Sequence, residues 1–457
     1  MTTPDLTIDS RARRLRDALG DRVLFPGDAG FDAARLPWNV VVDQRPIAVV
    51  RPETAEDVVD AVRAAVAAGL RVAPQSTGHA AAALADTDLS DVVLLSLAGL
   101  RGVTVDPLAR TARVLGGSQW NDVIAAAAPH GLTALHGSAG DVSVVGYALS
   151  GGISFYGRAH GMAVHSVREV QLVTAGGDLL RASADEHPEL FWAVRGGSGA
   201  FGVVVSLEID LLPYADVHAG MMLWDAAHAP AVAHAWASWT AAAPESATTT
   251  LRVLHIPPLP DFPPFLSGRS LVVIDGAILE TDAVAAELLA PLRALQPEMD
   301  TFGRIPAADL VGVHMDPPDP TPSITAHAVL DALPRDAVDH FLAAAGSPAL
   351  FVAELRHLGG AFARPRPDGG AVSAIEGEYL VDGIAVAPVP EAVGPATAAV
   401  QAMVAALGPW HGDALALTFI DGGGVPRAAG FGAAGERLRE LKHRYDPAGV
   451  FAAAHPL

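Results

Sequence analysis

Hydrophobic and polar positions alternate in the first half of the chain with the periods of both helices and strands. Val58, Val62 and Val66 recur at a four-residue spacing after Thr54, which predicts a helix that begins at Thr54 and has Asp57 as its capping partner. Short apolar runs predict strands at 70–73, 92–96, 103–106, 111–115, 169–174 and 203–212, with a further helix at 121–128. The first half is therefore a mixture of helices and strands.

The pattern changes after Pro213. Strands alternate there with long helices, and proline-rich loops occur at 257–264 and 317–322. This alternation is typical of an antiparallel sheet that carries helices on one face. We expect this region to form a separate domain.

The last part of the chain is expected to return to the first domain. It contains a predicted strand at 415–420 and a predicted helix at 434–443. The expected fold class is α+β, with a two-part domain made of 1–212 and 410–457. The segment 213–409 is expected to be an inserted domain of about seven strands.

Composition narrows the classes of function. The chain has 457 residues, 51% of them hydrophobic, which predicts a folded protein of two or three domains. A net charge of -21 without a basic patch argues against a nucleic-acid partner. The absence of cysteine excludes disulfides, thiolate nucleophiles and Cys-ligated zinc. The first residues lack the apolar core of a signal peptide and no run is long enough to span a membrane, so we expect a cytoplasmic protein.

One glycine motif resembles a dinucleotide fingerprint. Residues 197–202 read G-S-G-A-F-G, which fits G-x-G-x-x-G. That fingerprint binds pyrophosphate when it follows a strand and begins a helix, whereas here a helix predicted at 188–194 precedes it and the strand at 203–212 follows. A nicotinamide-dependent dehydrogenase therefore stays only as an alternative.

Two other loops are better candidates for holding a large cofactor. The loop Ser76-Thr77-Gly78 follows a predicted strand, and the segment 137–152 is rich in glycine and other small residues. Such loops can bind phosphate oxygens through backbone N–H groups without any lysine. Ser138 and Asp141 add polar side chains to the second loop. The alternative interpretation is that both loops are tight turns of a glycine-rich protein.

The order of these motifs resembles a known family. The series STGH, GSAGDVSVVGYALSGG, HPELFWAVRGGSGAFG and the closing YDPAGVFAAAHPL is similar to the berberine-bridge-enzyme-like flavoproteins, of the vanillyl-alcohol-oxidase and p-cresol-methylhydroxylase type. The resemblance covers about 35–212 and 410–457. It is looser in the middle, where GVHMDPPDP and ELRHLGGA carry it.

The resemblance implies an FAD cofactor and assigns residues to it. His79 matches the position at which the family attaches the flavin 8α-methyl group to an imidazole, so a covalent link is expected, with noncovalent FAD as the alternative. Many relatives add a second link through a cysteine, whose place here is Gly140, so a double link is impossible. The implied cofactor contacts are Gln75, Ser76, Thr77, Gly78, His79, Ala80, Gly137, Ser138, Asp141, Val142, Val145, Gly146, Gly151, Gly152, Gly202, Val203 and Val204.

Candidate groups on the substrate side come from the middle of the chain. In the strand predicted at 351–358, two-residue alternation directs Glu354 and Arg356 toward the interdomain cavity. The alternative interpretation is that they form a structural ion pair. Tyr379 and His314 are further candidates, with structural roles as their alternatives.

The C-terminal segment departs from the pattern of the family. Family relatives often place a tyrosine and an asparagine near the C-terminal strand and helix. Gly430 and Ala434 occupy these positions here, with Thr418 on the preceding strand. This departure puts the usual catalytic constellation in doubt.

The activity implied by the resemblance is an FAD-dependent oxidation. It would remove a hydride from a C–H bond next to oxygen or nitrogen in a small organic or natural-product substrate, with dioxygen as the re-oxidant. The alternative is a flavin enzyme that catalyses a cyclisation or isomerisation without net oxidation. The 17 histidines contain no H-E-x-x-H spacing and no G-x-S-x-G occurs, so neither a metal site nor a serine hydrolase is expected.

Overall fold

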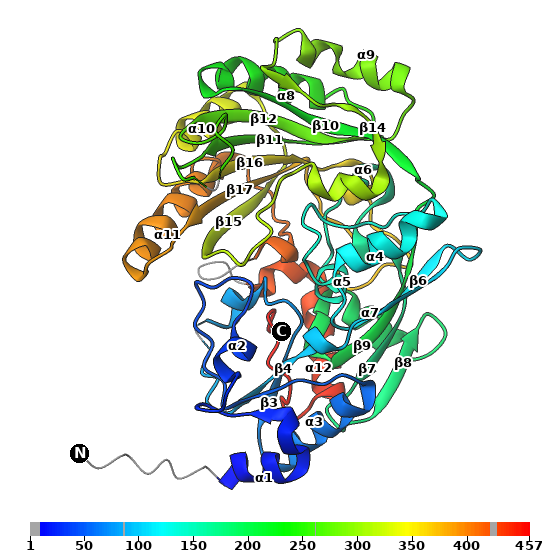
Figure 1. The fold of residues 1–457 in the computed structure, drawn as a ribbon. Coiled ribbons are helices and arrows are strands. Elements are labelled where there is room, and N and C mark those ends of the chain that lie inside the picture. The colour runs from blue at the N-terminus through cyan, green and yellow to red at the C-terminus, as the bar shows by residue number, and fades with distance from the viewer. Residues whose placement is uncertain (1–9, 86, 261, 421–426) are drawn as a thin grey trace.

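A computed structural model describes the protein over residues 10–85, 87–260, 262–420 and 427–457. Three sheets organise the fold, and the helices cover them (Figure 1). The α-helices are α1 (Ser10–Leu19), α2 (Phe31–Arg35), α3 (Ala55–Ala67), α4 (Trp120–Ala127), α5 (Val144–Leu149), α6 (Gly157–His160), α7 (Pro188–Gly197), α8 (Ala229–Thr240), α9 (Asp282–Arg293), α10 (Arg335–Ala345), α11 (Pro390–Ala405) and α12 (Gly435–Tyr445).

The strands alternate with these helices along the chain. They are β1 (Val23–Leu24), β2 (Ala48–Val50), β3 (Arg71–Gln75), β4 (Val92–Ser96), β5 (Val103–Asp106), β6 (Thr111–Leu115), β7 (Val167–Val173), β8 (Leu179–Ser183), β9 (Val203–Asp210), β10 (Asp216–Asp225), β11 (Ala247–His255), β12 (Ser270–Ile278), β13 (Met299–Asp300), β14 (Gly303–Pro306), β15 (Ser323–Leu330), β16 (Val352–His357) and β17 (Tyr379–Val386).

Two small sheets occupy the lower part of the molecule in Figure 1. One has the order β1-β2-β4-β3, with parallel pairing among β2, β4 and β3, and the other is antiparallel with the order β5-β6-β9-β7-β8. Helix α3 packs on the first sheet through Val58 and Val62, which are fully buried. The predicted cap is confirmed, because the Asp57 N–H donates to Thr54 Oγ1 over 3.1 Å.

An antiparallel sheet of eight strands forms the upper part. Its order is β13-β10-β12-β11-β16-β17-β15, with β14 also paired to β10. Helices α8 to α11 cover its outer face and share one hydrophobic core with it (Figure 1). Ala353 and Leu355 of β16 point into that core, so the alternating residues Glu354 and Arg356 face the lower part of the molecule. The α+β class with an antiparallel sheet covered on one face is confirmed.

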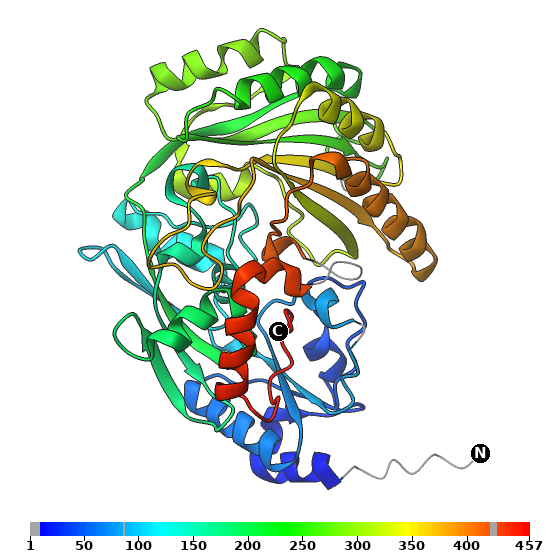
Figure 2. The same ribbon diagram turned by 180° about the vertical axis from the view of Figure 1, so that it is seen from behind.

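The C-terminal segment packs against the lower part of the molecule (Figure 2). Helix α12 lies against α7, and Phe451 pairs with Val72 of β3. The strand predicted at 415–420 is wrong, because Leu417–Phe419 form a 3₁₀ turn. A strand needs a partner, and the Ala416 N–H donates instead to the side chain of His327 over 3.2 Å. The domain boundaries proposed from the sequence stay a prediction.

No helix in the described part of the chain is long and apolar enough to cross a membrane. Within the same residues, no three His, Asp or Glu side chains are grouped so that they could hold a metal ion.

Candidate active site

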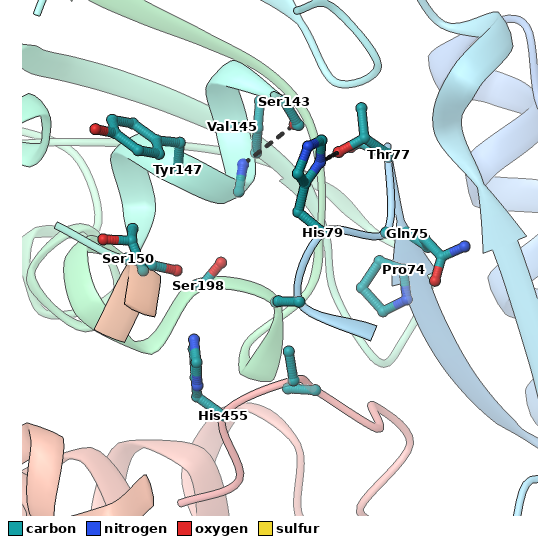
Figure 3. A pocket seen from close by; sticks show the side chains of 18 of the residues that line it. Pro74, Gln75, Thr77, His79, Ser143, Val145, Tyr147, Ser150, Ser198 and His455 are labelled. Atoms are coloured by element: carbon teal, nitrogen blue, oxygen red, sulfur yellow. Dashed lines mark hydrogen bonds between the residues drawn. The ribbon is translucent and has the colours of Figure 1, made fainter. Parts of the chain in front are cut away.

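A large cavity opens where the two small sheets meet the C-terminal segment (Figure 3). It encloses about 1210 Å³, including the part that opens to solvent. Its lining contains no Asp, Glu, Lys or Arg side chain among the described residues. The sequence-predicted contacts that line it are Gln75, Ser76, Thr77, Gly78, His79, Ala80, Val142, Val145, Gly146, Gly202 and Val204.

His79 lies in the wall of this cavity, in the loop that follows β3. Its Nδ1 is 2.8 Å from Thr77 Oγ1 (Figure 3), and its ring stacks on the indole of Trp38 with 4.4 Å between the ring centroids. The other ring nitrogen, Nε2, is buried without a hydrogen-bond partner and lies 3.9 Å from Asp141 Oδ1. The imidazole is thus held on one face and at one nitrogen, while the second nitrogen is left without a bond.

Burial determines the protonation state of His79. Loss of solvent lowers the pKa of the imidazole to about 4, and the carboxylate of Asp316 opposes this shift. The ring is therefore neutral at physiological pH, and one of its nitrogens carries a lone pair.

Gly78 has a packing reason to be glycine. Its φ is +82°, and a Cβ at this position would lie 2.6 Å from the Cβ of Pro37. The chain at Pro37 therefore lies directly against the loop, and a side chain at residue 78 would displace Pro37, the neighbour of the Trp38 that stacks on His79.

Six predicted cofactor contacts do not line the cavity. Gly137 and Gly152 pack against the ring of Tyr147, and Gly151 lies near Met162. Val203 points into the opposite core, because residues alternate along β9 and Val204 is the one that faces the cavity. The other two are Asp141, beside His79, and Ser138, which lines a small separate cavity near Arg356.

The glycine motif at 197–202 joins the same cavity. Gly197, Ser198, Gly199 and Gly202 line it, but α7 precedes the motif and β9 follows it, as the sequence predicts. This helix-to-strand order lacks the strand-to-helix turn of a nicotinamide fingerprint. The motif is therefore a wall of this cavity, and the dehydrogenase alternative loses its support.

A cluster of charged side chains occupies the inner face of the eight-stranded sheet. Its members, called the charge cluster below, are Arg252, Asp275, His314, Glu354 and Arg356. Asp275 is fully buried, pairs with Arg252, and lies 3.1 Å from His314 Nδ1. Arg252 also donates to the backbone oxygen of His314 over 2.7 Å. These contacts fix His314, which lies in the loop after the 3₁₀ turn Ala307–Gly312, against the inner face of the sheet.

The outer end of the cluster is Arg356. Its Nε pairs with Glu354, and its guanidinium lies over the ring of Phe419 at 5.1 Å. The sequence prediction that Glu354 and Arg356 share a face agrees with this geometry, and the predicted ion pair is also present. Arg356 is the member that lines a cavity.

His314 has two possible protonation states in this setting. Its Nε2 is 3.1 Å from Arg356 Nη2, a contact that suits a neutral ring, and 3.6 Å from Glu354 Oε2, a contact that suits an imidazolium. We assign the imidazolium, because three carboxylates (Asp275, Glu354 and Asp316) surround two arginines and a third positive charge balances them. Burial and Arg252 lower the pKa of His314, but the carboxylates outweigh both and raise it to about 9.

His314 should make stability depend on pH in the alkaline range. Because its pKa rises from 6.5 to about 9 on folding, its contribution is fully present below pH 6.5 and is lost as the pH rises through about 9. The loss should be on the order of 3 kcal/mol. Urea unfolding at pH values below and above this range would measure it. His314→Gln should abolish the dependence and the surface variant His234→Gln should keep it; equal slopes in all three proteins would contradict the assignment.

Tyr379 lies apart from these groups. Its side chain is buried in the core on the helix-covered side of the sheet, where its hydroxyl is 2.8 Å from Thr240 Oγ1 and its ring stacks on His357 at 5.5 Å. The structure therefore supports the structural alternative for this tyrosine.

Comparison with known proteins relates part of the cavity wall to a known domain. A family model described as an FAD binding domain matches residues 46–183. These residues form an FAD-binding domain. They supply the His79 loop and the 142–150 wall of the cavity.

Solved structures extend the likeness to the whole chain. BBE-like 1 of Physcomitrella patens superposes with a TM-score of 0.84 at 20% identity, over 98% of this chain and 99% of that one. The 6-hydroxy-D-nicotine oxidase of Arthrobacter nicotinovorans gives a TM-score of 0.79 at 23% identity, over 94% and 96% of the two chains. The chain thus has the berberine-bridge-enzyme-like fold that its motifs resemble.

Curated relatives match by sequence over a shorter stretch. The (R)-6-hydroxynicotine oxidase of Paenarthrobacter nicotinovorans is 38% identical over 204 residues, which are 44% of this chain and 44% of that protein. The xylooligosaccharide oxidase of Thermothelomyces thermophilus is 33% identical over 171 residues, or 37% and 34%. The aligned part therefore spans less than half of either relative.

The residues of the pocket fit FAD. Small residues line the pocket at Ser76, Gly78, Gly197, Ser198, Gly199 and Gly202, and backbone N–H groups of such segments can bind a pyrophosphate without a basic side chain. The unpartnered Nε2 of His79 gives the pocket a nucleophilic nitrogen. At Gly140, a Cβ would overlap the side-chain oxygen of Asn121, so this position has no room for a side chain.

The contacts predicted from the sequence omit several residues that line the pocket. They are Ser143, Tyr147 and Ser150 of the 137–152 segment, Ser198 of the glycine motif, and Leu417, Thr418, Ile420 and His455. Thr418 and His455 come from the C-terminal segment, and Figure 3 shows His455 pointing into the pocket from the side opposite the 143–150 wall. Only the family-like closing sequence YDPAGVFAAAHPL signalled that this segment returns to the pocket.

Proposed function

We propose that the protein is an FAD-dependent oxidase of small organic molecules, with the flavin attached covalently to His79. The observation that carries the proposal is the neutral, half-buried imidazole of His79, whose buried Nε2 has no hydrogen-bond partner in the wall of an FAD pocket. The proposal includes the domain division, with FAD held by 1–212 and 410–457 and the substrate by 213–409.

Bound FAD would accept a hydride from a C–H bond next to oxygen or nitrogen of the substrate. The relatives named hydroxynicotine oxidase and xylooligosaccharide oxidase support this type of reaction. Dioxygen is proposed as the re-oxidant on the same ground.

The protein's own contribution on the substrate side comes from the charge cluster. Glu354 and Phe419 hold the Arg356 guanidinium in one orientation, so it can bind an oxygen of the substrate without first being ordered. Asp275 and His314 hold Glu354 and Arg356 in place from behind. Their burial excludes water from this side of the site.

An absorption spectrum of the purified protein, before and after acid precipitation, is the first test. A yellow protein whose colour stays in the pellet is expected. Colour released to the supernatant would show that FAD is bound without a covalent link. A colourless protein that takes up no added FAD would overturn the whole proposal.

Anaerobic incubation with a panel of secondary amines and of sugar alcohols tests the reaction. Bleaching of the flavin by one class, followed by hydrogen peroxide production in air, is expected. Conversion of a substrate without bleaching would instead favour the cyclisation or isomerisation alternative.

A further inference from the structure

Trp38 connects three parts of the site around His79. Its indole stacks on the imidazole at 4.4 Å and an interplanar angle of 17°. Its Nε1–H donates to Asp141 Oδ2 over 2.6 Å, and its backbone N–H donates to the Thr77 oxygen over 2.9 Å. One tryptophan is thus fixed to the His79 loop by its backbone and to the 137–152 loop by its side chain.

These contacts restrict the imidazole to one pose. The indole covers one face of the ring, and Thr77 Oγ1 engages Nδ1. If Nδ1 donates its proton to Thr77, the lone pair is on Nε2, which has no hydrogen-bond partner. Asp141 Oδ1 lies 3.9 Å from Nε2, too far to bond it but close enough to stabilise a positive charge on the ring.

We propose that Trp38 and Asp141 are positioning residues for covalent attachment of the flavin to His79. The inference rests on the proposed function. Trp38 orients the ring, and the Asp141 carboxylate, held by the indole N–H, compensates the charge that develops on the imidazole during the reaction. A well-oriented nucleophile can gain several orders of magnitude in rate over a mobile one.

Attachment of the flavin is an oxidation of the 8α-methyl group by the flavin ring itself. A bond forms between His79 Nε2 and the 8α carbon of oxidised FAD. One C–H bond of the 8α-methyl group breaks, and so does the N–H bond at His79 Nδ1. Thr77 Oγ1 accepts the proton from Nδ1 and passes it on. The electron pair stays on the flavin ring, which is reduced by two electrons and gains both protons. Dioxygen then removes two electrons and two protons as hydrogen peroxide.

The test follows the rate of attachment in three variants. Protein produced in riboflavin-starved cells is given FAD, and the acid-stable flavin fraction is measured against time beside the total flavin bound. Trp38→Ala loses stacking and the indole donor, Trp38→Phe keeps a ring without the donor, and Asp141→Asn keeps the acceptor for the indole but loses the charge. Trp410→Phe, at a tryptophan that contacts His340 edge to face far along the chain, is the control.

We expect attachment to slow by on the order of tenfold in Trp38→Phe and Asp141→Asn, and further in Trp38→Ala, while reversible FAD binding persists. The control should attach flavin at the wild-type rate. Wild-type rates in both Trp38→Phe and Asp141→Asn would overturn the inference and leave the proposed function intact. A wild-type protein that binds FAD but never attaches it would overturn the inference and the covalent link together, while oxidation by reversibly bound FAD would stand.

Discussion

Replacement of His79 by alanine is expected to abolish acid-stable flavin completely, while the protein still binds FAD. His79 is the only histidine besides His455 in the described lining of the pocket, and no cysteine exists to replace it. The backbone N–H groups of the 76–78 and 197–202 segments remain, so affinity for FAD should persist. Acid precipitation followed by absorption of pellet and supernatant measures the change.

The matched control for this variant is His455→Ala. It removes the other imidazole of the pocket and should keep the covalent flavin. The assignment of the link to His79 would be wrong if His79→Ala kept acid-stable flavin, or if His455→Ala lost it with His79 intact. Substrate turnover should also fall in His79→Ala, because loss of the electron-withdrawing link lowers the tendency of the flavin to accept a hydride.

Attachment in the wild type should tolerate acid. Because burial lowers the pKa of His79 to about 4, the reactive lone pair stays available at pH values at which an ordinary histidine is protonated. The rate of attachment should stay level down to about pH 5 and fall below it. A fall centred near pH 6.5 would show that the imidazole is exposed to solvent.

The second large effect is expected at Asp275. Replacement by alanine leaves Arg252 buried without its counter-charge and removes the partner of His314, so unfolding should become easier by about 3–5 kcal/mol. The midpoint of thermal unfolding and the rate of proteolysis both report this loss. The double variant Asp275→Leu with Arg252→Met removes both charges and should recover part of it.

Asp339→Ala serves as the control for Asp275. Asp339 pairs with His234 at 2.8 Å on the surface, where it is 54% exposed, and its loss should change stability by less than about 0.5 kcal/mol. Equal unfolding midpoints for the Asp275 and Asp339 variants would contradict the structural role of the charge cluster.

Local patterns in the sequence were sufficient to predict part of the fold and of this site. The capping pair Thr54–Asp57, the alternation that turns Glu354 and Arg356 inward, and the His79 loop all depend on neighbours within a few positions. The same rule of alternation separates Val203 from Val204, and applying it there would have removed Val203 from the predicted contacts.

Contacts between distant segments could not be predicted in this way. Trp38 and Asp141 are 103 positions apart, and nothing near either residue indicates the other. Asp275 meets His314 only because the loop after the 3₁₀ turn Ala307–Gly312 lies against β12 in the folded sheet. Gly137 and Gly152 were assigned to the cofactor because they are small, but that space is taken by the ring of Tyr147.

The pairing of Phe451 with Val72 has a consequence for how the protein is made. The pocket combines residues 74–81 with Thr418 and His455, which are translated only after the whole eight-stranded sheet. A nascent chain therefore carries His79 long before the wall that faces it exists. Flavin can be enclosed only after both segments have been translated and have met, so cofactor loading depends on the folding of the segments between them.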